Sequence, residues 1–536
     1  MSLIDYIVVG SGPAGAIAAK TLVDAGKNVT MINVGFTPNP DNQMLPGKTL
    51  IDLRRHDKDQ YKYIIGQHGE GLAWGDVAGG AQITPPRQYM VKAIDRFMPT
   101  TSRTFFPIQS LGYGGLGISW GLQCWEYSIP DLDKMGLDSR RIKAAYNTVG
   151  NMIGISATRD EAARYTIDEL KSFQPSVKAD RNHQLILNTY KKHSKRFIKK
   201  GVYVGRTPLA ILTKPTAGRK AYRYLETDFY SDADKSLWRP WITIDELKRQ
   251  PNFKYIDNRL VLSFDESNGV VTIKTLDVTN NKIATYSCKK LILAGGALGT
   301  ARIVMRSQGG IGTKVPILSN PHSYVPAIQP RFFGKGYENN KLNMGQVSYF
   351  IDPAGNDSDL TVASSYGYQS LMLFRIISQI PFNFADARLL SRFILPGLIV
   401  MIVQHPDYQS KDKYLRLAKD DNSATGDKLE AHYSLTKQVE ATWDKREKKL
   451  TSLMRKLWTF PIMRIKTEHG SGIHYAGTLP ISKEPKPLHI GQDGNLHGTQ
   501  NVFIADSSGF NYLPGKGLTF TIMANAHAVA NKAMED

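Results

Sequence analysis

The chain has 536 residues, 41% of them hydrophobic, which is enough for two domains with sizeable cores. Its longest apolar runs have the length of a strand, well short of the ~20 residues that span a membrane. The net charge of +20 at pH 7 fits either solvated helix faces or attraction to an anionic partner, such as a phosphorylated substrate or an acidic membrane surface. No nucleic-acid recognition motif accompanies this charge, which argues against nucleic acid as a partner.

Cysteine usage and the N-terminal residues both favour a cytoplasmic protein. Cys124 and Cys288 have neither a metal-ligand spacing nor a CxxC motif, and so sparse a usage fits a reducing compartment. Residues 1–9 lead directly into a glycine-rich turn, so we expect no cleavable signal peptide. We predict a cytoplasmic location, with peripheral membrane contact left open, and no metal site.

The first elements along the chain predict a doubly wound nucleotide-binding unit. Residues 4–9 form a short apolar run that is typical of a buried parallel strand. Residues 13–25 have helical spacing, with Gly26 able to cap the helix, and residues 28–34 predict a second strand. This order of strand, turn, helix and strand is Rossmann-like.

The turn between the first strand and the helix reads Gly10-Ser-Gly12-Pro-Ala-Gly15. Gly10 permits the tight turn, Gly12 lets the backbone approach a pyrophosphate, and Gly15 lets helix and strand pack closely. The helix N-terminus then offers amides and a positive dipole end to the phosphates. We predict dinucleotide binding here, with Asn33 in the place where an acidic residue usually binds the ribose.

The remaining pattern indicates a first domain that is interrupted by a second. Strands are expected over residues 253–264, 270–276 and 289–294, and residues 140–200 are mostly helical. From about residue 315 to 465, alternating segments predict an antiparallel sheet, followed by a long amphipathic helix over 435–457. We therefore predict an α/β fold with a discontinuous Rossmann-like cofactor domain, residues 1–314 and 466–536, and an inserted antiparallel-sheet substrate domain, residues 315–465.

The C-terminal segment contains His474-Tyr-Ala-Gly-Thr478, Ala505-Asp506-Ser-Ser508 and Lys516-Gly-Leu-Thr519. Together with the N-terminal glycine turn, these motifs resemble those of the glucose-methanol-choline (GMC) flavoprotein oxidoreductases, nearest the pyranose oxidase and cholesterol oxidase branch. The resemblance is strong over residues 4–35, 112–125, 289–306 and 470–530, and weak across the inserted domain.

The resemblance implies a bound FAD and a catalytic histidine. His474 matches the family's His-x-x-Gly-Thr motif, and a histidine with a pKa near neutrality can take a hydroxyl proton while the carbinol hydride goes to flavin N5. Asp506 would approach the ribityl-pyrophosphate region. The helix from about Thr519 would point its N-terminus at the flavin N1/O2 edge, where its dipole favours negative charge.

Ser119 stands where the pyranose oxidase branch has a histidine bonded covalently to the flavin, so the resemblance implies non-covalent FAD. The expected cofactor-binding residues are Gly10, Gly12, Gly15, Asn33, Gly114, Gly115, Ser119, Trp120, Leu260, Gly295, Arg302, Asp506, Ser507, Leu518 and Thr519.

One position departs from the family pattern. The family supplies a second active-site group, an asparagine or histidine followed by proline, and the aligned positions here are Gly517 and Leu518. Asn511, Tyr512 and Lys516 are candidates to compensate.

Residues 374–394 are largely apolar and aromatic, with interspersed arginines. This composition fits either core packing or an interfacial lid for a lipid-linked substrate.

We expect an FAD-dependent oxidoreductase that oxidises a CH–OH group of a small sugar or polyol-like substrate. The substrate class includes anionic and lipid-linked molecules. The sequence does not define the electron acceptor. Two alternatives stay open: a redox-neutral isomerase or epimerase acting through transient oxidation, and a flavin-binding protein without turnover. Gly517 motivates the second. A nicotinamide-dependent dehydrogenase shares the glycine turn but leaves the C-terminal motifs unexplained.

Overall fold

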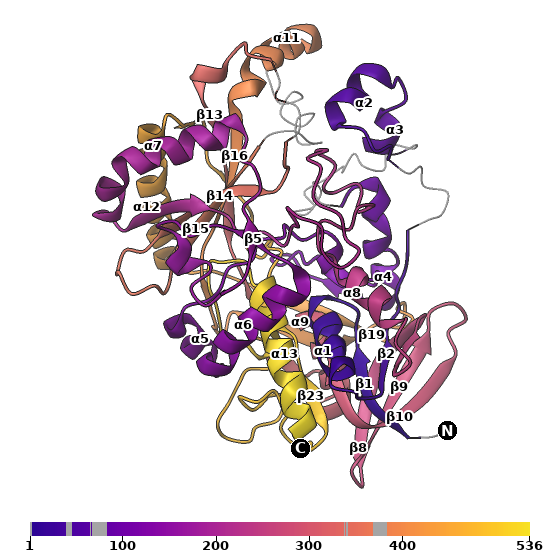
Figure 1. The fold of residues 1–536 in the computed structure, drawn as a ribbon. Coiled ribbons are helices and arrows are strands. Elements are labelled where there is room, and N and C mark those ends of the chain that lie inside the picture. Colours follow the sequence, from indigo (N-terminus) through magenta and orange to yellow (C-terminus); the bar gives the residue numbers. More distant parts are fainter. Residues whose placement is uncertain are drawn as a thin grey trace.

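The computed structural model describes residues 3–38, 45–64, 66, 83–336, 338, 341–367 and 383–535 (Figure 1). The chain forms a mixed α/β structure with two large sheets, and this confirms the predicted fold class.

The first sheet has seven strands, and its centre is parallel. Strands β7 (Phe253–Ile256), β2 (Val29–Ile32), β1 (Ile4–Val9), β10 (Ile283–Leu293) and β23 (Val502–Ile504) run in this order and are parallel. The long strand β10 pairs antiparallel with β9 (Val270–Asp277) through residues 283–288 and parallel with β23 through residues 291–293. Strand β8 (Arg259–Ser267) completes the sheet.

Both faces of this sheet are covered, as its near-continuous apolar strands require. On one face lie α1 (Pro13–Asp24), α8 (Pro240–Leu247) and α13 (Thr519–Glu535), whose small side chains form one core cluster with Val8. On the other face lies α9 (Gly296–Gln308), which packs with Ile7 and Val9. In Figure 1 the first helix, indigo, and the last helix, yellow, lie side by side on the sheet.

The second sheet is antiparallel. Its order is β20 (Phe460–Pro461), β13 (His322–Ile328), β16 (Leu398–Gln404), β15 (Thr361–Gly367), β14 (Gly345–Ile351) and β6 (Val202–Arg206), and β21 (Ile465–Lys466) also pairs with β13. One face packs against α7 (Arg181–Ile198) and α12 (Lys437–Met454) around residues such as Tyr190, Val347 and Leu453.

Two elements of this second layer precede residue 315. Strand β6 forms the edge next to β14, and α7 covers the sheet, although the sequence analysis assigned both to the cofactor domain. Contacts between residues so far apart along the chain leave no local pattern. The division at residues 314 and 466 stays a prediction.

A small sheet joins the two layers. Strands β11 (Lys314–Pro316), β18 (Lys413–Lys419), β19 (Asp427–Tyr433) and β3 (Thr100–Thr101) pack their apolar side chains on α9. The other elements are α2 (Leu50–His56), α3 (Tyr61–Ile64), α4 (Ile94–Phe97), α5 (Ile129–Met135), α6 (Ser139–Ile153), α11 (Phe384–Ile394), β4 (Ser156–Ala157), β5 (Gln174–Pro175), β12 (Leu318–Ser319), β17 (Asp407–Tyr408), β22 (Tyr475–Ala476) and β24 (Tyr512–Leu513).

Helix α11 contains the only described part of the apolar segment 374–394, whose residues 374–382 lie outside the described residues. Leu389 and Phe393 of this helix are 69% and 53% exposed. Core packing therefore does not account for these two side chains. Among the described residues, no helix is long and apolar enough to cross a membrane.

Candidate active site

A cavity of about 280 Å³ lies where the carboxyl ends of β1 and β10 meet the N-termini of α1, α9 and α13. Its walls come from both ends of the chain and from the segment around residue 115. The carboxyl edge of a parallel sheet is where doubly wound folds bind ligands.

The cavity brings together most of the residues expected from the sequence. Those that line it are Gly10, Gly12, Asn33, Gly115, Ser119, Trp120, Leu260, Gly295, Arg302, His474, Asp506, Ser507, Leu518 and Thr519. Gly15 and Gly114 do not line it. Both contact residues that line the cavity: Gly15 packs against the Gly10 carbonyl, and the Gly114 amide donates to Ser11 Oγ at 3.0 Å.

The glycine turn leaves an open cradle at the start of α1. A Cβ atom on Gly10 or Gly15 would lie 2.5 Å or 1.9 Å from a backbone oxygen, so these two positions are closed by packing. A Cβ on Gly12 would have no atom within 4 Å. Gly12 is also the N-cap of α1 and provides no side-chain cap, so the first amides of the helix are available to an anion.

Asn33 is oriented by its amide nitrogen. Its Nδ2 donates to Ser11 Oγ at 2.6 Å and to Tyr255 Oη at 3.4 Å. The amide oxygen is thereby left as an acceptor at the cavity wall, where it could receive a hydroxyl hydrogen.

Arg302 supplies an incompletely paired cation to the cavity wall. The side chain is 2% exposed, and its Nη2 donates to the Pro99 carbonyl and to Thr100 Oγ1. Its Nε and Nη1 make no hydrogen bond among the described residues, and Asp427 lies 3.6 Å away. Burial, and then the neighbouring Arg306, lower the pKa of Arg302 to about 9. These two nitrogens are buried from solvent, so Arg302 contributes positive charge to the wall and the open amides at the start of α1 are what fits the pyrophosphate of a dinucleotide such as FAD.

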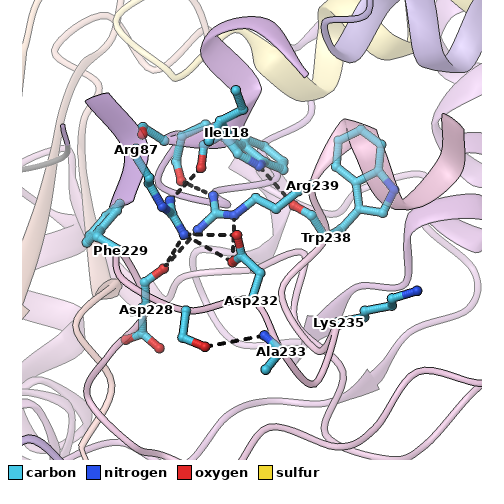
Figure 2. Close-up of polar contacts among 12 residues, drawn as sticks. Arg87, Ile118, Asp228, Phe229, Asp232, Ala233, Lys235, Trp238 and Arg239 are labelled. Carbon is cyan, nitrogen blue, oxygen red and sulfur yellow. Dashed lines mark hydrogen bonds and ion pairs between the residues drawn. The ribbon is translucent and has the colours of Figure 1, made fainter. Parts of the chain in front are cut away.

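Two buried arginines hold the wall segment around Trp120 (Figure 2). Arg87 donates to the Ile118 carbonyl, and Arg239 donates to the Trp120 carbonyl at 2.9 Å. Both guanidinium groups also bond the Asp228 carbonyl and pair with the Asp232 carboxylate. Ser119 lies between the two held carbonyls, and its hydroxyl donates to Met90 Sδ at 3.2 Å. The arginines therefore fix the backbone that presents Ser119 and Trp120 to the cavity.

Asp506 and Ser507 line the cavity but use their side chains to join segments of the protein. The Asp506 carboxylate accepts from Thr300 Oγ1 at 2.6 Å and from the Ser508 amide at 2.9 Å. Ser507 Oγ donates to the Tyr475 carbonyl at 2.6 Å. These bonds attach the C-terminal motif to α9 and to the strand that follows His474.

His474 lies at the wall of the cavity, and Asn320 determines its tautomer. Asn320 Nδ2 donates to the carbonyls of His405 and Pro514 at 2.7 Å and 2.9 Å, so its oxygen must be the atom that faces His474 Nδ1 at 3.0 Å. An amide oxygen only accepts, so Nδ1 carries the hydrogen and Nε2 has the free lone pair. Gln404 Nε2 also lies 3.5 Å from Nδ1.

Burial keeps His474 neutral. Desolvation, and then the charge of His322, lower the pKa of His474 to about 4. The sequence analysis expected a pKa near neutrality, and the enclosed site explains the lower value. At neutral pH the imidazole is therefore in the form that can accept a proton.

The three candidates to compensate for Gly517 all make their contacts elsewhere. Asn511 Nδ2 donates to the Ile481 carbonyl, the Tyr512 ring lies tilted against the Tyr408 ring, and Lys516 Nζ donates to the Glu126 carbonyl at 2.8 Å. None of them lines the cavity. Gly517 does line it, beside the Trp125 ring and His474 Cε1.

Sequence reasoning missed two polar residues of the site. Asn320 orients His474, and Gln123 lines the cavity wall beyond Trp120. Asn320 comes to the site from a segment distant from His474, whereas Gln123 follows Trp120 by three residues and could have been proposed from that neighbourhood. Only the position of Asn320 in three dimensions reveals it.

The chain is similar to known proteins in one sequence segment, over its length and in its fold. Residues 402–526 match the GMC oxidoreductase C-terminal family model. The chain is 22% identical to paromamine 6'-oxidase from Streptomyces fradiae over 562 aligned positions, which cover 98% of this chain and 90% of that protein. Its fold is similar to that of pyridoxine 4-oxidase from Mesorbium loti, with a TM-score of 0.59, 11% identity and 99% of each chain covered.

The matched family segment, 402–526, contains His474, Asp506 and the start of α13, and GMC oxidoreductases are flavoproteins. The similarity to the GMC oxidoreductases is therefore carried by residues 402–526, and both of the similar proteins named above are oxidases.

Proposed function

We propose that this enzyme binds FAD non-covalently and oxidises a CH–OH group of a sugar-like or polyol-like small molecule, with His474 as the base. The observation that carries the proposal is the bonding of His474, whose Nδ1 hydrogen is taken by Asn320 while Nε2 stays free in the neutral imidazole. A general base needs such an unprotonated nitrogen within reach of the hydroxyl.

The cofactor-binding residues in this proposal are those of the cavity wall. The amides at the start of α1 would hold the pyrophosphate, the positive charge of Arg302 in the cavity wall would favour its binding, and Asn33 Oδ1 would accept from the ribose. The N-terminus of α13 would stabilise negative charge on the reduced ring. Ser119 has a hydroxyl, bonded to Met90 Sδ, in place of the imidazole that a covalent link of this kind requires.

A bound flavin would supply the acceptor for the hydride. The protein's part is to hold the carbinol against His474, whose Nε2 takes the hydroxyl proton as the C–H bond breaks and the carbonyl forms. Asn320 keeps the imidazole in the required tautomer throughout and accepts from the imidazolium after proton transfer. The resulting charge is enclosed, so return of the proton to solvent must follow each turnover.

Substrate class is supported by the proteins that resemble this chain. Paromamine 6'-oxidase is named for an aminosugar compound and pyridoxine 4-oxidase for a small polar alcohol. We infer a polar, hydroxyl-bearing substrate here, and the position oxidised and the electron acceptor are to be found by experiment.

The test is an anaerobic absorbance titration of the purified protein with paromamine, pyridoxine, neutral sugars and lipid-linked sugars. Bleaching of the flavin band by one of them, abolished in His474→Ala and retained in His469→Ala, is the expected result. His469 is a suitable control because it is partly exposed and pairs only with Glu440. A flavin that no alcohol reduces would contradict oxidation and favour binding without turnover. Reduction followed by return of an isomerised substrate, with no external acceptor, would favour the isomerase alternative.

The predicted contact with an acidic membrane is supported by one surface. Arg196 in α7, Lys200 just after α7 and Lys456 just after α12 are neighbours: desolvation, and then the charges of Arg196 and Lys200, lower the pKa of Lys456. Trp458, which is 60% exposed, follows directly. Cosedimentation with phosphatidylserine vesicles, lost in Trp458→Ala with Lys456→Ala and absent from phosphatidylcholine vesicles, is expected if this surface binds membranes. Cytoplasmic location is part of the same proposal.

A further inference from the structure

The second sheet presents a polar face toward the active site. Alternate residues of its strands point to opposite faces. Val347, Ala363 and Met401 pack against α7 and α12 on one face. Ser364 and Tyr366 alternate with the buried set and meet Gln123 on the other face.

Gln123 is held there with its amide nitrogen fully used. Nε2 donates to Ser364 Oγ at 2.9 Å and to Tyr366 Oη at 3.1 Å, which accounts for both of its hydrogens. A Cβ on Gly345 would lie 2.3 Å from this nitrogen, so the glycine makes the room that the amide occupies. The orientation of the amide is thus determined by two bonds and by packing.

The amide oxygen is left without a protein partner. Gln123 lines the cavity together with His474 and Gly517, and its Oε1 accepts no hydrogen bond from the described residues. Oε1 is not one of the fully buried polar atoms that lack a partner. Because it has no partner in the described part of the chain, it must be accessible, and the side chain lines the cavity. An oriented, accessible acceptor in a mostly apolar cavity can recognise a donor group on a ligand.

We propose that Gln123 Oε1 forms a substrate subsite that accepts a hydrogen bond from a hydroxyl or ammonium group other than the hydroxyl that His474 deprotonates. This inference rests on the proposed function and narrows its substrate class to molecules with at least two donors, such as polyols and aminosugars. A simple alcohol leaves Oε1 unpaired, and a site built to bond a donor rejects an analogue that lacks it. Gly517 leaves the cavity wall beside His474 without a side chain, so recognition falls to Gln123, which β15 orients.

The experiment compares binding and reduction for a donor-rich and a donor-poor ligand. Dissociation constants for glucose, glucosamine, paromamine, pyridoxine and cyclohexanol are measured from the perturbation of the oxidised flavin spectrum in the holoenzyme. The variants are Gln123→Met, which keeps the length and removes the acceptor, and Gln123→Glu, which keeps an acceptor and adds charge.

We expect at least one donor-rich ligand to bind the wild type more tightly than cyclohexanol, and Gln123→Met to reduce that preference at least tenfold while leaving cyclohexanol binding unchanged. Gln123→Glu should favour the amines glucosamine and paromamine over glucose, because a carboxylate attracts an ammonium. Flavin affinity should stay as in the wild type, and cooperative unfolding, with a thermal midpoint lowered only by loss of the bonds to Ser364 and Tyr366, shows that the variants fold.

An unchanged preference in Gln123→Met, or a wild type that prefers no donor-rich ligand, would overturn the subsite. Failure of the proposed function has a different signature: the flavin stays oxidised with every ligand while the Gln123-dependent preference in binding persists.

Discussion

Single substitutions in the turn from Gly10 to Gly15 distinguish glycines that are needed for packing from Gly12, which faces the proposed cofactor. Gly12 has φ −69°, which alanine adopts readily, and an added Cβ would have no atom within 4 Å. Gly12→Ala should therefore fold, with a gain of about 0.4–1 kcal/mol from reduced freedom of the unfolded chain. The matched control is Gly336→Ala, at a second open position remote from the cavity.

The same methyl group should weaken cofactor binding. It occupies the cradle at the start of α1, where the pyrophosphate would bond the helix amides. Loss of one hydrogen bond to a charged group costs about 1.5–3 kcal/mol. At 1.4 kcal/mol for each factor of ten, FAD affinity should fall roughly 10- to 100-fold.

Gly15→Ala should show the opposite pattern, because its Cβ would lie 1.9 Å from the Gly10 carbonyl oxygen. Relief of this overlap requires α1 and β1 to separate. We expect this to lower the free energy of unfolding by an amount near the upper end of about 1–3 kcal/mol. The assays are FAD titration by quenching of flavin fluorescence and urea denaturation of the apoprotein. Wild-type FAD affinity in Gly12→Ala, with a protein that folds normally, would refute the assignment of this turn to the pyrophosphate.

Three further predictions follow from the contacts of the site. The rate of anaerobic flavin reduction should be constant from pH 8 to about 5 and should fall as the pH drops through about 4, because protonated His474 cannot accept a proton. A fall in rate centred near pH 6.5 would contradict the burial of His474. In Asn320→Asp this fall in rate should occur at higher pH, since a carboxylate 3.0 Å from His474 Nδ1 stabilises the imidazolium. A fall at the same or lower pH would refute the contact between residues 320 and 474. Stopped-flow flavin reduction measured across pH tests the wild type and the variant. Arg239→Met should lower the free energy of unfolding by about 1–3 kcal/mol, because the buried Trp120 carbonyl loses its donor and Asp232 and the Asp228 carbonyl keep only Arg87. Arg164→Met at an exposed ion pair should cost at most about 1 kcal/mol, and equal urea midpoints for the two variants would contradict the role of the buried pair.

The parts of the fold that could be predicted are those that local sequence determines. The turn from Gly10 to Gly15 follows a strand of continuous apolar residues and opens a helix, so its structure needs only neighbouring residues. The amphipathic helix expected over 435–457 is α12, Lys437–Met454, for the same reason. Periodicity of side chains is sufficient for such elements.

The parts that could not be predicted depend on contacts between distant segments. Asn320 reaches His474 across 154 residues, and Gln123 meets Ser364 across 241. Arg302 was expected from a motif, but its contacts with Pro99 and Thr100 had no counterpart in the sequence pattern. A polar residue in a loop has many possible partners, and only the tertiary fold selects one.

The pairing of β23 with β10 and the packing of α13 on α1 have a consequence for synthesis of the protein. Strand β1 and the glycine turn leave the ribosome first, yet the edge of β10 and one side of α1 stay uncovered until residues 502–535 have been translated. The wall that contains Asp506 and Thr519 does not exist before then. The proposed cofactor would therefore bind only after translation of residues 502–535, and until β23 pairs with β10 the nascent chain exposes an apolar strand edge of the kind that chaperones protect.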